Sequence, residues 1–433
     1  MATRVIDVNE RPSMAESIPL SFQHLFAMFG ASVLVPILFK INPATVLLMN
    51  GIGTLLYIFI TKGKIPAFLG SSFAFISPVF LVISGGSYQQ ALSGFIVSGL
   101  IFITVAILFK YLGTEWIHVV FPPAAMGAIV AIIGLELAPV AANMAGLISK
   151  NNQPLDPKAV TVSVSTLGVV ILGSILFRGF LKIIPILVGV VFGYVLSLLM
   201  GVVNFSAISQ AQWFALPTFY TPEFSLSAII VIIPASLVVI AEHIGHLIVT
   251  GNIVGRDLTK DPGLHRSLMG DGVSTTISGF FGSVPTTTYG ENIGVLAITR
   301  VYSVWVIGGA AVISVVVSFF GKLAAAIQTI PLPVMGGISL MLFGVIAASG
   351  IRMLVEARID YSKPRNLILT AFVLVIGLSG AQIKIGSVTL AGMALATVFS
   401  IFISLAFKLF EVLGWMNEEE GSDVQSPKSE VRQ

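Results

Sequence analysis

The chain has 433 residues and a formal net charge of +3; 56% of its residues are hydrophobic, only 10% are charged, and the mean hydropathy is +0.99. An ordinary soluble domain carries about 25% charged residues, because its surface has to be covered with polar groups. The composition therefore excludes a soluble enzyme, a nucleic-acid-binding protein and a disordered protein, and the absence of cysteine excludes disulfides and thiolate metal sites.

Long apolar runs predict fourteen membrane-spanning helices, because a helix needs roughly 20 apolar residues to cross a bilayer. A β-barrel fits less well, since its strands alternate apolar and polar residues. The expected fold class is an all-α polytopic membrane protein. In chain order, the spans are expected at residues 19–39, 44–61, 66–84, 89–111, 117–138, 160–177, 181–203, 227–250, 268–282, 285–299, 303–320, 326–350, 365–382 and 388–411. The polar residues 416–433 are expected to form a disordered tail.

The distribution of Lys and Arg predicts the orientation of these spans. If the N-terminus and every second loop are cytoplasmic, that side carries 18 of the 23 basic residues, and the other side carries Lys40, Lys150, Lys158, Lys322 and Lys384. Cytoplasmic loops of membrane proteins are enriched in Lys and Arg. We therefore expect both termini in the cytoplasm.

Weak internal similarity predicts that the two halves of the chain are related. Residues 122–129 (PPAAMGAI) resemble residues 331–338 (PLPVMGGI), and Gln23-His24 resembles Glu242-His243. These matches pair span 1 with span 8 and span 5 with span 12. Because each copy has an odd number of spans, the second copy has to be inverted relative to the first. Inverted repeats are typical of secondary transporters, whose substrate site lies at the membrane midplane.

Spans 3 and 10 are poor helices, and each contains a predicted break. Span 3 contains Pro66 and the run 70–72 (GSS), and span 10 contains Pro285, three threonines and Gly290. Pro lacks an amide donor, Gly is flexible and Thr favours extended backbone. We expect a short strand and then a half-helix in each span, with the strands paired antiparallel, because unpaired amides are costly in a bilayer. Two kinked helices packed on small residues are the alternative.

Few ionisable residues fall inside the predicted spans, and they are Glu136, Glu242, Asp271 and Glu291, with His24, His243 and His246. A carboxylate at the midplane costs about 2.5–3.5 kcal/mol or more, so it marks a site. Glu242 and His246 share one helix face because they are one helical turn apart, and Glu291 begins the second half-helix. We expect Glu136 to extend to the membrane surface and Asp271 to cap the N-terminus of span 9.

Two carboxylates and a histidine beside free backbone amides suit a small neutral ligand with N–H and C=O groups. Carboxylates accept hydrogen bonds from ring N–H groups, and amides donate to ring carbonyls. Phe73 and Tyr289 lie on the breaks, where an aromatic side chain can stack on a flat ring. Glu242 and His246 could together carry a proton; a helix–helix hydrogen bond is the alternative role of His246. His24 and His243 are expected to pack or to support the site.

At residues 291–300 (ENIGVLAITR), the chain resembles the signature of the nucleobase–ascorbate transporter family. That signature has Glu, Gln or Pro before Asn-x-Gly and, four residues later, Thr and a basic residue. Further stretches are similar to the members of that family that carry uracil with a proton, and these are residues 22–30 (FQHLFAMFG), 64–73 (KIPAFLGSSF), 241–246 (AEHIGH), 288–294 (TYGENIG) and 330–336 (IPLPVMG). The resemblance covers nearly the whole membrane portion.

This resemblance implies a secondary active transporter that imports uracil by proton symport, without a metal or cofactor. Its fourteen spans would form two inverted sevens, divided into a core domain (residues 1–115 and 226–324) and a gate domain (residues 116–225 and 325–415). The core domain would slide against the gate domain like an elevator. The resemblance also implies a homodimer.

The resemblance assigns roles to particular residues. Those implied to bind the nucleobase are Glu242, Glu291, Phe73 and Gly290, and Tyr289 and Ser72 on the two breaks are further predicted binding residues. Those implied in proton coupling are His246, Glu242 and Ser339, and those implied to support the site are His24, Asn292 and Asp271. Backbone amides are the contacting groups at Phe73 and Gly290.

Two departures from the uracil-carrying members leave the ligand range open. Phe343 stands where a tyrosine is expected, and Asp271 replaces an Asn, although Asp occurs in purine-transporting relatives. A purine or xanthine:proton symporter is therefore the first alternative. An anion transporter of similar architecture is a weaker one, because two carboxylates repel an anion. An intramembrane enzyme is not expected, because the sequence lacks a His-Glu-x-x-His motif, an Asp-rich metal pair and a Ser/Lys dyad.

Overall fold

The computed structural model describes residues 5–149, 154–386 and 388–416, and this part of the chain is mostly helical. Lys150 and the tail predicted from residue 417 onward lie outside these ranges. Each predicted span coincides with a helix or with a strand followed by a helix, as the bounds below show.

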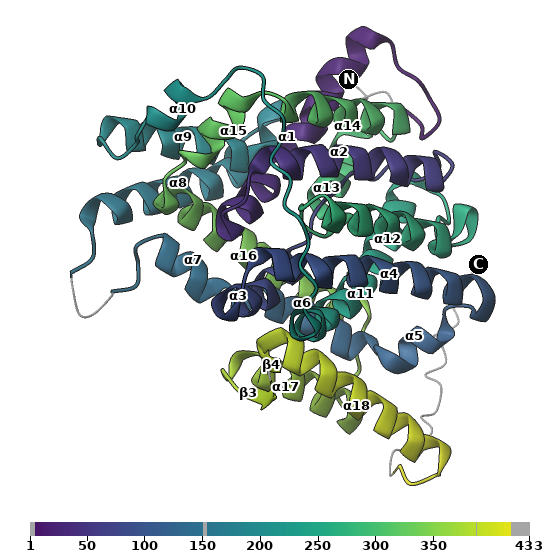
Figure 1. Ribbon diagram of the computed structural model, residues 1–433. Coiled ribbons are helices and arrows are strands. Elements are labelled where there is room, and N and C mark those ends of the chain that lie inside the picture. Colours follow the sequence, from purple (N-terminus) through teal and green to yellow (C-terminus); the bar gives the residue numbers. More distant parts are fainter. Residues whose placement is uncertain (1–4, 150–153, 387, 417–433) are drawn as a thin grey trace, which may run out of the picture.

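One set of helices, here named the first helix group, comes from two separate parts of the chain. Its long members are α1 (Met14–Phe39), α2 (Pro43–Ile60), α4 (Tyr88–Leu112), α11 (Leu226–Val254), α12 (Leu264–Phe280) and α14 (Val304–Ser318). Helix α12 packs on α2 and α4, α14 packs on α1 and α2, and α11 packs on α4. Figure 1 shows α14, α2, α12 and α4 as a stack of side-by-side helices.

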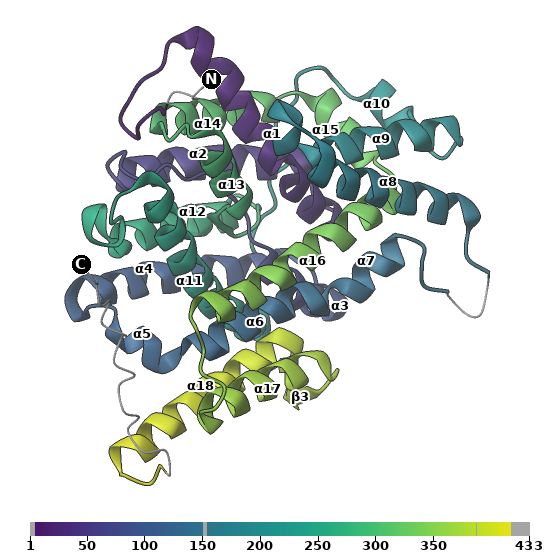
Figure 2. The same ribbon diagram turned by 180° about the vertical axis from the view of Figure 1, so that it is seen from behind.

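The second helix group consists of α5 (Glu115–Val120), α6 (Pro123–Glu136), α7 (Ala138–Met144), α8 (Pro157–Leu176), α9 (Pro185–Leu199), α16 (Leu332–Glu356), α17 (Pro364–Leu378) and α18 (Gly392–Val412). Helix α16 packs on α6, α7 and α8, and α17 packs on α6 and α18 (Figure 2). The two groups meet where α11 contacts α18 and α6, and where α1 contacts α9 and α16.

Short elements complete the fold. The third predicted span contains β1 (Leu69–Ser71), η1 (Phe73–Phe75) and α3 (Ile76–Gly85), and the tenth contains β2 (Thr286–Thr288) and α13 (Gly290–Thr299). Strands β3 (Gln382–Ile385) and β4 (Val388–Ala391) form an antiparallel hairpin between α17 and α18. The remaining helices are η2 (Gly179–Ile183), α10 (Ser206–Gln210), η3 (Thr259–Gly263) and α15 (Gly321–Gln328).

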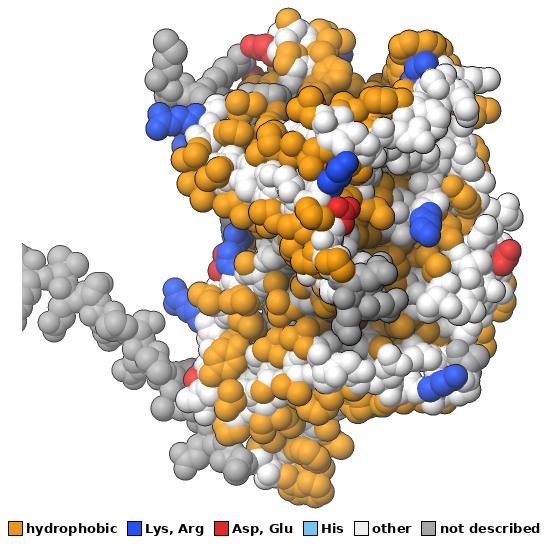
Figure 3. Space-filling view, turned by 90° about the vertical axis from the view of Figure 1, so that its left-hand side faces the viewer, with side chains coloured by type: hydrophobic (Ala, Val, Ile, Leu, Met, Phe, Trp, Pro, Cys, Tyr) orange, Lys and Arg blue, Asp and Glu red, His pale blue; other side chains and the backbone are white. Residues whose placement is uncertain are grey.

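Length and composition make many of these helices suitable for crossing a bilayer. In the described residues, eight helices are long and apolar enough, namely α1, α2, α4, the continuous stretch Pro123–Met144 of α6 and α7, α8, α11, α16 and α18. Shorter apolar helices are η1 with α3, α9, α14 and α17. Figure 3 shows one face on which hydrophobic side chains predominate and charged ones are sparse. The protein is therefore a multi-pass membrane protein.

Glycines allow α4 and α12 to approach closely. A Cβ atom added to Gly99 would come within 2.5 Å of the amide nitrogen of Thr276, and one added to Gly272 within 2.9 Å of the carbonyl oxygen of Gly99. Two helix backbones are in direct contact there, as is common between helices in membranes. This contact fixes α12, which in turn packs against β2.

Candidate functional site

The backbone of the site is a two-stranded antiparallel sheet buried inside the first helix group. Strand β1 pairs with β2 in the register Leu69 with Thr288, Gly70 with Thr287 and Ser71 with Thr286. Two further bonds extend the pairing, because Tyr289 N donates to Phe68 O at 3.0 Å and Ser72 N donates to Pro285 O at 3.0 Å. All residues of both strands are buried. The amides of the two broken segments are therefore satisfied by each other and, at Leu69 and Thr286, by the hydroxyls of Thr54 and Thr275.

Glycine is required at position 70 because the ring of Tyr289 lies directly on it. A Cβ atom added to Gly70 would come within 2.0 Å of that ring. The hydroxyl of Tyr289 donates to the carbonyl oxygen of Ser71 at 3.1 Å. The aromatic side chain at the second break is thus held against the backbone of the first.

The structure brings the two predicted carboxylates together. Glu242 lies in the middle of α11, and Glu291 lies in the first turn of α13, directly after β2. Helix α11 contacts β2 and α13, and His246, one turn after Glu242, lies beside Gly290, the residue that precedes Glu291. The two carboxyl groups therefore belong to adjoining elements. Both glutamates are half-buried. The N-terminus of α13 favours a negative charge at Glu291.

His246 lies on the same face of α11 and contacts the second break. Its Nδ1 is 3.2 Å from Thr288 Oγ1. Its ring is also beside Gly290, since Nε2 is 3.4 Å from the place where a Cβ atom of that residue would be. Adding a proton to Glu242 or His246 would therefore change the electrostatic potential at the junction between β2 and α13.

Asp271 is not an N-cap, so that prediction was wrong. Helix α12 begins at Leu264, and Asp271 lies about two turns inside it, where its Oδ2 is 2.7 Å from Nδ1 of His243. Nε2 of His243 is 2.8 Å from Ser267 Oγ, which is 2.6 Å from the hydroxyl of Tyr57. All four side chains are fully buried. Residues 259–263 (TKDPG) form η3, and α12 begins directly after it at Leu264.

Asn292 and His24 form a second polar contact, between α13 and α1. The amide nitrogen of Asn292 donates to the carbonyl oxygen of His24 at 3.1 Å and lies 3.2 Å from Nδ1 of the same residue. Both residues are buried. They fix the half-helix that carries Glu291 against the first helix of the chain.

The remaining predicted residues lie at or near the boundary between the helix groups. Ser72 is buried, and its hydroxyl has no partner within the described residues. Phe73 contacts Phe343 of α16 edge to face, with ring centroids 6.2 Å apart. The hydroxyl of Ser339 donates to the carbonyl oxygen of Met335 within its own helix at 2.7 Å, so it is engaged away from His246 here.

Glu136 does not extend to the membrane surface, contrary to the expectation. It is half-buried at the end of α6, where its carboxyl group accepts from Ser77 Oγ at 2.5 Å and from Met393 N at 3.0 Å. The sequence contains no signal for this contact, because the three residues lie far apart in the chain.

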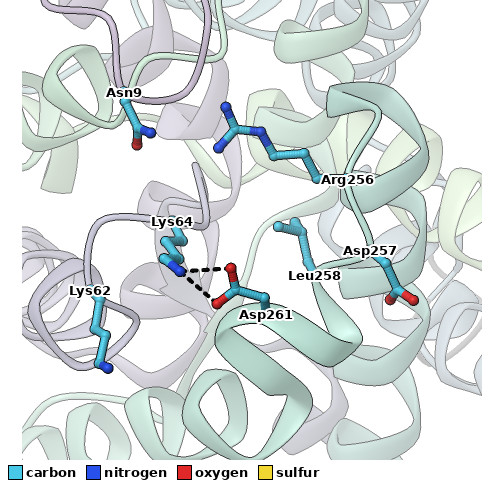
Figure 4. A pocket seen from close by; sticks show the side chains of 7 residues that line it. All are labelled: Asn9, Lys62, Lys64, Arg256, Asp257, Leu258 and Asp261. Carbon is cyan, nitrogen blue, oxygen red and sulfur yellow. Dashed lines mark hydrogen bonds and ion pairs between the residues drawn. The ribbon is translucent and has the colours of Figure 1, made fainter.

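A cavity of about 190 Å³ opens beside Glu291. It lies between the two groups, with Phe26 of α1 and Gly294 of α13 on one side and residues 182–187 of η2 and α9 on the other. A larger cavity of about 600 Å³ lies among loop residues at the ends of α2 and α11 (Figure 4). Two of its charged residues form ion pairs, Lys64 with Asp261 at 2.6 Å and Arg256 with Asp7 at 2.7 Å. Hydrogen bonds from Thr259 and Lys260 lower the pKa of Asp257 there. The smaller cavity is the one that adjoins a carboxyl group of the candidate site, that of Glu291.

Comparison with known proteins places the chain in a family. The model of the Permease family (Xan_ur_permease) matches residues 15–386. The chain is 63% identical over 421 residues to the uracil permease of Paenibacillus larvae subsp. larvae, covering 96% of this chain and 100% of that protein. It is 65% identical over 413 residues to the uracil permease of Escherichia coli (strain K12), covering 95% and 96%, and 47% identical over 410 residues to that of Bacillus subtilis (strain 168), covering 92% and 94%.

Solved structures show the same fold at low identity. The transmembrane domain of the cyanobacterium bicarbonate transporter BicA has a TM-score of 0.60 at 13% identity, covering 95% of this chain and 100% of that one. The overall structure of SLC26A9 has a TM-score of 0.68 at 11% identity, covering 93% and 65%. These transmembrane transporters support the fold class and carry no information on the ligand.

We predict that Asp271→Ala lowers the free energy of unfolding by about 3 kcal/mol, because it leaves His243 in a buried site without its charged partner. The control is Glu356→Ala, which removes an exposed ion pair with Arg352 and should cost less than about 1 kcal/mol. Thermal unfolding of both variants in detergent checks the difference. Equal losses in the two variants would show that the buried pair adds nothing.

Proposed function

The chain belongs to the permease family whose model it matches, and from this premise we propose that it imports uracil together with a proton. Family membership confirms the resemblance seen in the sequence, and it makes the protein a transporter and not an enzyme. The observation that carries the proposal is that the helix with Glu242 packs against the paired break that directly precedes Glu291.

The ligand we propose is a pyrimidine held by opposite kinds of hydrogen-bonding groups. Glu242 and Glu291 accept from ring N–H groups, while the amides of Phe73 and Gly290 donate to ring carbonyls. Phe73 and Tyr289 offer aromatic surface to the flat ring, and the buried hydroxyl of Ser72 is free to bond to it. Relatives named uracil permease at up to 65% identity support uracil as this pyrimidine.

The proton is proposed to couple through Glu242 and His246, with Ser339 as an additional partner when the groups move. Glu242 and Glu291 repel each other when both are charged. Protonation of one and binding of a ligand with N–H groups relieve the same repulsion, so each favours the other, and this coupling is reciprocal. His24, Asn292 and Asp271 hold the helices that carry these groups.

For the movement, we propose that the first helix group is the core domain (residues 1–115 and 226–324) and the second is the gate domain (residues 116–225 and 325–415). Fourteen spans in two inverted sets of seven would place the two broken spans in corresponding positions, and the pairing of β1 with β2 supports this arrangement. The core would slide along the gate, exposing the ligand to either side in turn. Both termini would be cytoplasmic in a bacterial inner membrane, and the protein would be a homodimer.

A purine or xanthine symporter is the rival that one observation favours, namely the aspartate at position 271 in the buried network with His243. Purified protein should be stabilised against heat by uracil, and labelled uracil uptake should be reduced by excess unlabelled uracil and not by xanthine. The reverse order of competition would replace uracil by a purine. Stabilisation by bicarbonate or chloride alone would favour an anion transporter.

We predict that Glu242→Gln and Glu291→Gln each weaken uracil binding by about 100-fold, because a hydrogen bond to a charged group is worth about 1.5–3 kcal/mol and the amide places a donor against the ring N–H. Glu411→Gln, on an exposed turn of α18, should bind normally. Isothermal titration measures the affinities, and thermal unfolding establishes that each variant is folded. Retained affinity in a variant would remove that carboxylate from the site.

We predict that His246→Ala reduces uptake driven by a proton gradient at least about tenfold, while equilibrium uracil binding falls by less. The reason is that the imidazole would share the coupled proton and would not contact the ring. His118→Ala, at an exposed residue of α5, is the matched control. Proteoliposome uptake with and without a pH gradient gives the comparison. If binding and driven uptake fall equally, His246 has no part in coupling.

A further inference from the structure

We propose that Glu136 is a latch between the two helix groups, and that its bond to Ser77 sets the equilibrium between transport states. The latch consists of the Glu136 carboxyl group, the Ser77 hydroxyl and the Met393 amide. The proposal rests on the movement of the core domain proposed above, and it gives a role to the intramembrane carboxylate that the ligand site does not use.

The carboxyl group of Glu136 acts as an N-cap for a helix from another part of the chain. Helix α18 begins at Gly392, and its own N-cap residue, Ala391, provides no side-chain acceptor. The carboxylate of Glu136 accepts from Met393 N at 3.0 Å, in the first turn. A negative charge is favourable there, because the N-terminus of a helix carries free N–H groups and the positive end of the helix dipole.

The absence of a side chain at Gly392 leaves room for the carboxyl group of Glu136. Its φ is +52°, which favours glycine, and a Cβ atom added to it would come within 1.9–2.8 Å of the carboxyl atoms of Glu136. No larger residue fits between the carboxylate and the start of α18. The carboxylate is therefore seated in the second helix group.

The other oxygen of the carboxylate reaches across to the first helix group. Ser77 Oγ donates to it at 2.5 Å. Ser77 lies in the first turn of α3, which also lacks a side-chain cap of its own. Helix α3 packs mainly on α4 and α11, and it has a smaller contact with α18. One carboxylate thus lies between the N-terminal turns of two helices, one from each group.

The position of Ser77 links the latch to the ligand site. It is one turn after Phe73, whose amide is proposed to bind the ring. Two other hydroxyls, those of Ser339 and Thr370, bond within the second helix group, to Met335 and Ala124. The contact of Phe73 with Phe343 is apolar and can slide at little cost. A directional bond to a carboxylate has to break when the core moves, so it favours one state over the other.

The experiment measures the two states directly, in the natural cysteine-free background. Spin labels on Leu112→Cys and Val412→Cys, at exposed ends of α4 and α18, report the distance between the groups in lipid nanodiscs without ligand. Ser77→Ala should shift the ratio of the two distance populations by about tenfold, the size expected for one hydrogen bond to a charged group. Ser77→Thr, which keeps the hydroxyl, should restore the parent distribution.

Two controls separate the latch from general loosening of α3 or α18. Ser84→Ala removes a hydroxyl of the same helix that donates to Leu81 O, and it should leave the distribution unchanged. Glu136→Ala, which removes the acceptor, should shift the distribution, and adding Ser77→Ala to it should cause no further shift, because both act through one bond. An unchanged distribution in Ser77→Ala, or additive shifts in the double variant, would overturn the latch. Failure of the uracil proposal would appear instead as absent uracil uptake by the parent protein.

Discussion

The structure depends on one constraint, which is that every backbone amide within a bilayer needs a partner. In two spans the helix is interrupted, and the backbone groups left without helical partners there pair across β1 and β2. Because the strands come from distant parts of the chain, the pairing fixes the first turns of α3 and α13 at one place. The N–H groups of those turns remain for a ligand, so the requirement for paired amides also creates the candidate site.

Buried charge is the second consequence. Glu291 lies at the start of α13, where the helix end favours a carboxylate, but Glu242 and Asp271 lie within helices. Asp271 is compensated by His243 at 2.7 Å. Glu242 has no such partner close by, and its charge interacts with that of Glu291. The group left uncompensated is the one that gains most from a proton or a ligand.

The sequence was sufficient to predict what depends on local composition. Long apolar runs predicted the helices, and Pro66, Gly70 and Pro285 predicted the breaks in spans 3 and 10. Glu242 and His246 could be assigned to one face from their spacing alone. Contacts between distant helices could not be predicted. The pair of Asp271 with His243 was missed because Asp271-Gly272 looks like a helix start, and the capping of α18 by Glu136 was missed because no local pattern joins α6 to α18.

The three glutamates inside the predicted spans differ in the hydrogen-bond donors that the protein provides for them. This difference distinguishes a structural carboxyl group from the two at the candidate site. The carboxyl group of Glu136 accepts hydrogen bonds from a serine hydroxyl and a backbone amide, so it has partners without a ligand. For Glu242 and Glu291, the described residues provide no side-chain donor, although removing their carboxyl groups from water also costs free energy. Under the proposed function, a guest with N–H groups or a proton would compensate these two carboxyl groups. The same lack of a donor would then favour both ligand binding and protonation, and this is how the proposal links uptake to the proton gradient.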